Sequence, residues 1–70
     1  SEANKDTVEQ KETIKYYLDR SESRIKELES DLTNERTIPP DIQKAMEADL
    51  DTIKVTRDKL AKKLESLTAD

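Results

Sequence analysis

The sequence contains no cysteine and no histidine. Without thiols the chain has no disulfides and no thiolate nucleophile, and without imidazole it lacks the commonest ligand for zinc, copper and haem iron. Any bound metal would have to be a hard cation held by carboxylates. No nucleophile is paired with a base in an apolar setting, so we expect no cofactor and no enzymatic activity.

Glycine is also absent, and the only two prolines are adjacent, at Pro39 and Pro40. These residue types usually interrupt helices, so the chain on either side of the prolines is free to be helical. The lack of glycine excludes an EF-hand calcium loop. Phenylalanine and tryptophan are missing too, and 43% of the residues are charged, a composition that raises the question of disorder. The spacing of the apolar residues argues against disorder.

Apolar residues recur at alternating intervals of three and four, which is typical of helices that pack along one narrow seam. The seam positions are Lys11, Ile14, Leu18, Ser21, Ile25, Leu28, Leu32 and Glu35, followed by Gln43, Met46, Leu50, Ile53, Arg57, Leu60, Leu64 and Leu67. Proline suits a first helical turn, so Pro40 is expected to begin the second helix. We predict an all-α fold, a two-helix antiparallel coiled-coil hairpin with helices at about 4–36 and 40–68. Residues 1–70 would form this one hairpin, with a turn at about 36–40 and frayed ends at 1–6 and 69–70.

One antiparallel register matches the two seams. If facing residues have numbers that sum to 78, the apolar layers are Leu32 with Met46, Leu28 with Leu50, Ile25 with Ile53, Leu18 with Leu60, and Ile14 with Leu64. The same register places Ser21 opposite Arg57, and any slip would bury Arg57 against apolar residues. We therefore predict that Ser21 and Arg57 form a polar layer that fixes the register, with Arg57 reaching solvent or a carboxylate such as Glu22.

A hairpin of this size buries little apolar surface, so it would gain stability from docking onto a partner or a second copy, for example as a four-helix bundle. Small residues that permit close helix approach lie opposite the second seam. The candidate interface consists of Ala45, Ala48, Thr52, Val55, Ile42 and the exposed aromatic residue Tyr16. The alternative is that these are ordinary residues of a solvated helix face.

Acidic residues are concentrated near the turn: residues 22–51 hold nine acidic and four basic residues. Like charges four residues apart repel each other on a helix, and such locally unfavourable sequence can mark a site. The candidate acidic patch, for a basic partner or hard cations, consists of Glu27, Asp31, Glu35, Glu47 and Asp51. The alternative is a solvated acidic surface that keeps a small protein soluble.

The net charge of −4 argues against binding to nucleic acid, which needs clustered lysine and arginine. No apolar run approaches the roughly 18 residues of a membrane span, so we expect no membrane insertion. The compartment is not readable from a chain without thiols; the cytoplasm is slightly favoured, and export after signal cleavage is an alternative.

The expected function is a non-enzymatic protein–protein interaction module, such as an adaptor, small chaperone or assembly factor, that acts through helix faces and binds a protein partner or itself. One alternative is a structural spacer or scaffold segment of a larger protein or assembly. A third is an acidic module that binds cations or a basic partner.

Overall fold

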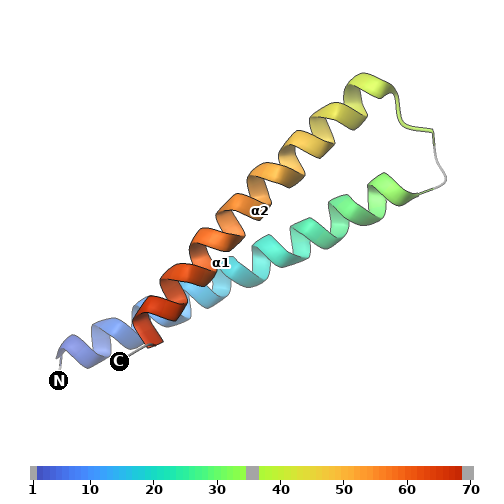
Figure 1. The fold of residues 1–70 in the computed structure, drawn as a ribbon. Coiled ribbons are helices and arrows are strands. Elements are labelled where there is room, and N and C mark those ends of the chain that lie inside the picture. Colours follow the sequence, from blue (N-terminus) through green and yellow to red (C-terminus); the bar gives the residue numbers. More distant parts are fainter. Residues whose placement is uncertain (1, 35–36, 69–70) are drawn as a thin grey trace.

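The computed structural model describes residues 2–34 and 37–68, with side chains from Lys5 onward. Two helices, α1 (Glu2–Thr33) and α2 (Pro40–Thr68), pack against each other and run antiparallel. Figure 1 shows both chain ends at one end of the molecule and the turn at the other. The molecule is a rod with extents of 55 × 14 × 14 Å. The predicted all-α helical hairpin is confirmed.

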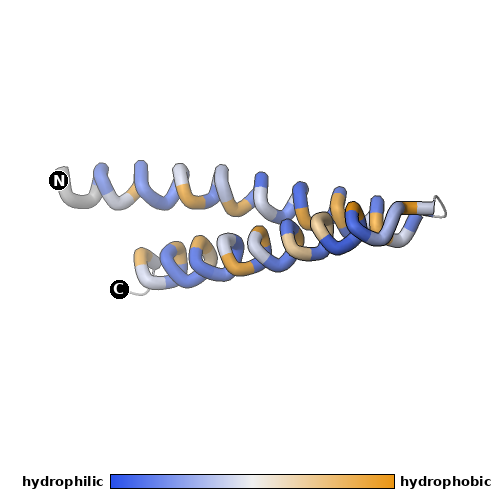
Figure 2. Tube along the Cα trace, turned by 90° about the horizontal axis from the view of Figure 1, so that it is seen from above, coloured by the Kyte–Doolittle hydropathy of each residue, from blue (hydrophilic) through white to orange (hydrophobic). Residues whose placement is uncertain are grey.

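The helices wind around each other. In Figure 1 they lie side by side near the turn and cross in projection near the open end. In Figure 2, turned by 90°, they overlap near the turn and are separate at the open end, with the hydrophobic segments of α1 on its side toward α2. Winding of this kind keeps a seam with a spacing of three and four residues in contact along its whole length.

The start of α2 follows from its two prolines. Pro40 is the first helical residue, where its missing N–H has no partner to lose. The backbone N–H of Gln43 donates to the carbonyl of Pro39 at 2.9 Å, the first hydrogen bond of the helix. Asp41 lies in the first turn, near the positive end of the helix dipole. The predicted bounds of α2 agree with the structure.

The end of α1 differs from the prediction, because the helix ends at Thr33 rather than near residue 36. The Thr33 hydroxyl donates to the carbonyl oxygens of Glu29 and Ser30, at 3.0 and 3.1 Å. The Asn34 N–H turns back to the Asp31 carbonyl at 3.3 Å, a tightened last turn. The bond to Asp31 satisfies a carbonyl that a longer helix would have used. Residues 35–36 and 69–70 lie outside the described residues, so the seam position at Glu35 and the frayed C-terminal end stay predictions.

The core lies in the half of the hairpin nearer the turn. Ile25, Leu28 and Leu50 are buried, with exposed fractions of 5%, 3% and 9%. Leu32, Met46 and Ile53 are partly buried and pack against these three residues. This cluster contains all six residues of the three predicted layers that lie between Ser21 and the turn. Toward the open end the seam residues are only partly buried: Ile14, Leu18, Leu60, Leu64 and Leu67.

The predicted polar layer lies between the two halves. Ser21 and Arg57 are both partly buried. Ser21 lines a surface hollow together with Ile53 and Leu60, the seam residues on either side of Arg57, as the register requires. The Arg57 Nε donates to Oδ1 of Asp58 at 3.1 Å. The carboxylate that pairs with Arg57 is therefore its neighbour on α2 and not Glu22.

Candidate interaction surface

The two sides of the seam differ in charge. One side carries an ion pair that joins the helices, with Nζ of Lys54 3.7 Å from Oε2 of Glu29. The helical spacing of three and four residues extends this side along both helices. We call it the charged side, and it includes Lys15, Asp19, Glu22, Lys26, Glu29, Lys44, Glu47, Asp51, Lys54 and Asp58. Both signs of charge are interspersed along it.

The opposite side has fewer charges. On α1 it is the stripe that contains Tyr17 and Arg24, and on α2 the stripe that contains Ile42 and Thr56. We call it the low-charge side, and its neutral members include Gln10, Thr13, Tyr17, Asn34, Ile42, Ala45, Thr52 and Thr56. Most of its charged members are separated by sign along the rod: Glu27, Asp31 and Asp49 lie toward the turn, and Arg20, Lys59 and Lys63 lie toward the open end. Arg24 lies between the two groups, and Asp6 lies near the N-terminal end of α1.

A surface hollow of about 450 Å³ lies on the low-charge side, at the level of the polar layer. Its lining residues are Tyr17, Arg20, Ser21, Arg24, Ile53, Thr56 and Leu60. The hollow has a physical cause, because Ser21 is too small to fill its layer and Arg57 turns to Asp58. Apolar seam residues are therefore accessible beside the cationic groups of Arg20 and Arg24.

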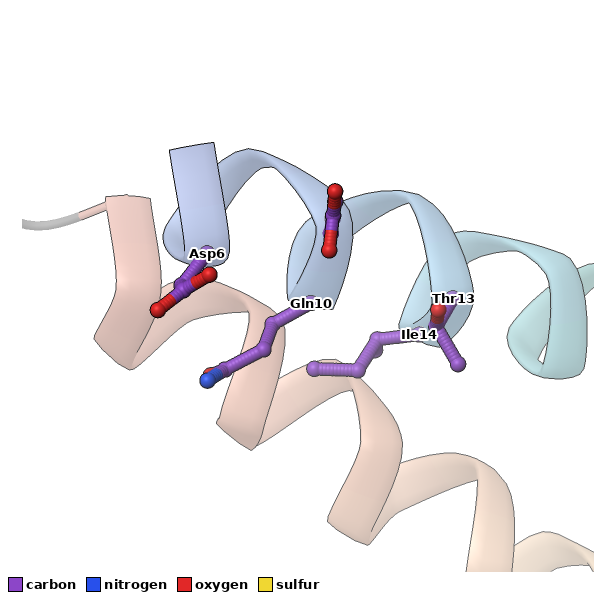
Figure 3. Close-up of a pocket in the computed structure, with 5 residues that line it drawn as sticks. Asp6, Gln10, Thr13 and Ile14 are labelled. Carbon is purple, nitrogen blue, oxygen red and sulfur yellow. The ribbon is translucent and has the colours of Figure 1, made fainter. Parts of the chain in front are cut away.

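Two further hollows include residues of the low-charge side. One is near the turn and is lined by Asp31, Asn34, Thr37, Ile38, Pro39, Ile42 and Met46. The other is at the open end of α1 and is lined by Asp6, Glu9, Gln10, Thr13 and Ile14. Figure 3 shows Gln10 and Ile14 pointing toward α2 in this second hollow. The low-charge side is thus uneven along its whole length.

The two tyrosines form an aromatic pair on α1. The rings of Tyr16 and Tyr17 meet edge to face, with centroids 5.1 Å apart and planes at 81°. The guanidinium carbon of Arg20 lies 5.6 Å from the centroid of the Tyr16 ring. Tyr17 faces the hollow, whereas Tyr16 is 57% exposed and lies on the outer face of α1.

Two threonine hydroxyls on the low-charge side bond to their own helix. The Thr52 hydroxyl donates to the Ala48 carbonyl at 3.1 Å, and the Thr56 hydroxyl donates to the Thr52 carbonyl at 3.3 Å. Such bonds turn the hydroxyl back to the preceding turn of the helix. The hydroxyl donors of Thr52 and Thr56 are therefore already used.

The structure leaves the predicted interface residues of α2 exposed: Ile42, Ala45, Ala48, Thr52 and Val55. Ile42 and Val55 are 49% and 53% exposed. Tyr16 is on the outer face of α1, and Val55 is on the outer face of α2. These outer faces point away from each other, so a single partner helix cannot cover both residues.

The predicted acidic patch is divided by the seam. Glu27 and Asp31 lie on the low-charge side, and Glu47 and Asp51 lie on the charged side. Oε1 of Glu27 is already paired with Nη1 of Arg24, at 2.9 Å. Among the residues with described side chains, no group of three or more carboxylates is placed to hold a metal ion. Glu35 lies outside the described residues, and binding of a basic partner stays a prediction.

Tyr17, Arg24 and Thr56 were not among the candidate site residues chosen from the sequence. Each of them lies one position before a seam residue. The signal that would have found them is the sequence of flanking residues on both helices, read side by side in the antiparallel register. Read helix by helix, they resemble ordinary surface residues.

Neither described helix is long and apolar enough to cross a membrane. No protein-family model, curated protein or solved structure shows a significant match to this chain.

Proposed function

We propose that this chain is a non-enzymatic protein–protein interaction module, an adaptor, small chaperone or assembly factor that binds through its helix faces. One observation carries the proposal. Within the described residues only Ile25, Leu28 and Leu50 are buried, whereas five large apolar side chains are about half exposed: Val8, Tyr16, Tyr17, Ile42 and Val55. A hairpin with so little core gains stability when a partner covers such side chains.

The test uses a photoreactive amino acid in living cells that make the protein. It is placed at Ile42 or Val55, and at Asp51 as a matched control on the charged side of the same helix. We expect one protein to be cross-linked from Ile42 or Val55 and not from Asp51. That protein, identified by mass spectrometry and purified, should bind the native chain saturably, and Ala48→Glu with Val55→Lys should weaken binding by roughly tenfold or more.

Two results would contradict the interaction function. One is equal cross-linking from all three positions, which indicates random encounters. The other is the absence of any cross-linked protein while the labelled chain remains folded by circular dichroism.

The rod shape favours a second candidate, a structural spacer or scaffold segment. Its extent of 55 Å against 14 Å in the other two directions suits a rigid arm. A spacer tolerates substitutions over its whole surface, so it predicts no positional preference in the cross-linking experiment. The two candidates therefore differ in one measurable outcome.

A further inference from the structure

We infer that the partner of the low-charge side is a second copy of this chain, docked antiparallel so that two hairpins form a four-helix assembly. The inference rests on the proposed interaction function and adds the partner, the surface and the orientation. It begins from the separation of charge along the low-charge side.

The acidic members lie at the level of the layer formed by Leu28 and Leu50, and the basic members lie near the layer formed by Leu18 and Leu60. These layers are ten residues apart on each helix, which corresponds to roughly 15 Å along the rod. Neutral residues of the low-charge side, among them Thr52 and Thr56, lie between and beside these charges. The surface therefore has an acidic end, a basic end and a middle in which the charged residue Arg24 is paired with Glu27.

The charges at the two ends are available to a partner. Within the described residues, Asp31 and Asp49 of the acidic end form no ion pair, and neither do Lys59 and Lys63 of the basic end. Arg24 lies between the ends and is already paired with Glu27 on its own helix. The Glu27 carboxylate therefore reduces the repulsion between the two central arginines of a symmetric pair.

Charge complementarity favours a second copy of the chain as the partner, and it favours antiparallel docking of the two copies. An antiparallel copy places its basic end over the acidic end of the first, and twofold symmetry repeats the contact. A parallel copy would place like charges over each other. The charged side offers no such preference, because both signs are interspersed along it.

The shape of the low-charge side fits the same partner. The hollow lined by Tyr17, Ser21 and Thr56 lies between the two ends, close to where the twofold axis would pass. Covering it would bury the accessible parts of Ile53 and Leu60. Tyr17, 49% exposed, and Ile42, 49% exposed, supply the larger apolar groups of the surface.

The test is sedimentation equilibrium over a wide concentration range, with three charge variants of the full chain. Arg20→Glu with Lys59→Glu gives both ends an acidic majority, and Asp31→Lys with Asp49→Lys gives both ends a basic majority. We expect each to weaken dimerisation by roughly tenfold or more. The variant with all four substitutions exchanges the majority charge of the two ends, keeps the native net charge and should dimerise again.

Matched controls separate the surface from the net charge. Lys15→Glu with Lys44→Glu and Asp19→Lys with Asp51→Lys make the same changes in net charge on the charged side, and they should dimerise like the native chain. Circular dichroism shows whether each variant is helical. For a variant that has lost its helices, the same comparison is made with Arg→Gln, Lys→Gln and Asp→Asn at the same positions.

The direction of the two copies is tested with a spin label at Thr13, near the open end of the low-charge side. An antiparallel dimer places the two labels at opposite ends of the assembly, and a parallel dimer places them close together. Short label distances would overturn the inferred direction.

A native chain that remains monomeric at every concentration would overturn the second copy as partner, and so would reversal variants that associate like the native chain. The interaction function would then still be decided by the cross-linking experiment, where a different protein captured from Ile42 or Val55 supports it.

Discussion

The two halves of the hairpin have the same sequence pattern and different packing. Near the turn, Ile25, Leu28 and Leu50 are buried, whereas near the open end Leu18 and Leu60 are only partly buried. The turn holds the helices together at one end, and the small Ser21 leaves a hollow beside the polar layer that divides the halves. The comparison teaches that a continuous seam does not give continuous burial. The turn-proximal half should hold most of the stability.

The largest expected difference is between two leucine truncations. Leu28→Ala removes a side chain that is 3% exposed and should lower the free energy of unfolding by roughly 2–5 kcal/mol. Leu60→Ala should lower it by about 1 kcal/mol, because part of that side chain is already in water. Urea unfolding followed by circular dichroism measures both. Equal losses would show that the two halves contribute alike.

The boundary between the halves is tested by Arg57→Leu. A leucine would extend the apolar seam across the polar layer, and we expect a gain of about 1–2 kcal/mol in the free energy of unfolding. We also expect the register to be less well fixed. Cysteines at Lys11 and Leu67, which face each other in the register that sums to 78, should then form a disulfide more slowly than in the native background. Unchanged oxidation rates would contradict a register-fixing role for Arg57.

The contribution of the first turn of α2 to stability is tested at Asp41, at the edge of the turn-proximal half. Asp41→Ala removes a negative charge from the first turn of α2 and should lower the free energy of unfolding by about 0.5 kcal/mol at low salt. Asp19→Ala in the middle of α1 is the matched control and should have a smaller effect. Salt should reduce the difference between the two variants. A difference that is independent of salt would point to a cause other than the helix dipole.

The smallest effect is expected for the ion pair between the helices. The side chains of Lys54 and Glu29 are 39% and 51% exposed, so solvent screens their attraction. A double-mutant cycle with Lys54→Gln and Glu29→Gln should give a coupling of about 0.3 kcal/mol. A coupling well above 1 kcal/mol would show that the charged side also holds the turn-proximal half together.

The fold was predictable because two independent patterns agree. Adjacent prolines divide the chain, and one antiparallel register pairs Leu28 with Leu50 and Ile25 with Ile53. The end of α1 at Thr33 was not predictable from the seam, since the tightened turn at Asn34 is a local feature that the apolar spacing does not record. The pairing of Arg57 with Asp58 likewise depends on side-chain geometry, which the spacing of residues in the sequence does not specify.

The candidate surface was predictable only in part. Of the interface residues predicted on α2, Ile42, Ala45 and Thr52 lie on the low-charge side, whereas Val55 lies on the outer face. Tyr17 and Thr56 are on different helices and line one hollow. That hollow forms only when α1 and α2 pack together, so neither helix alone indicates it. A surface shared by two helices is not a property of either helix sequence alone.

The inward hydrogen bonds of Thr52 and Thr56 have a consequence for hydration. Their hydroxyl donors are bonded to the carbonyls of Ala48 and Thr52, so a partner that covers these threonines takes no donated hydrogen bond away from water. The hydroxyl oxygens keep only their acceptor sites open to water or a partner, and the methyl groups add apolar surface. The low-charge side is therefore easier to dehydrate than the polarity of its sequence suggests.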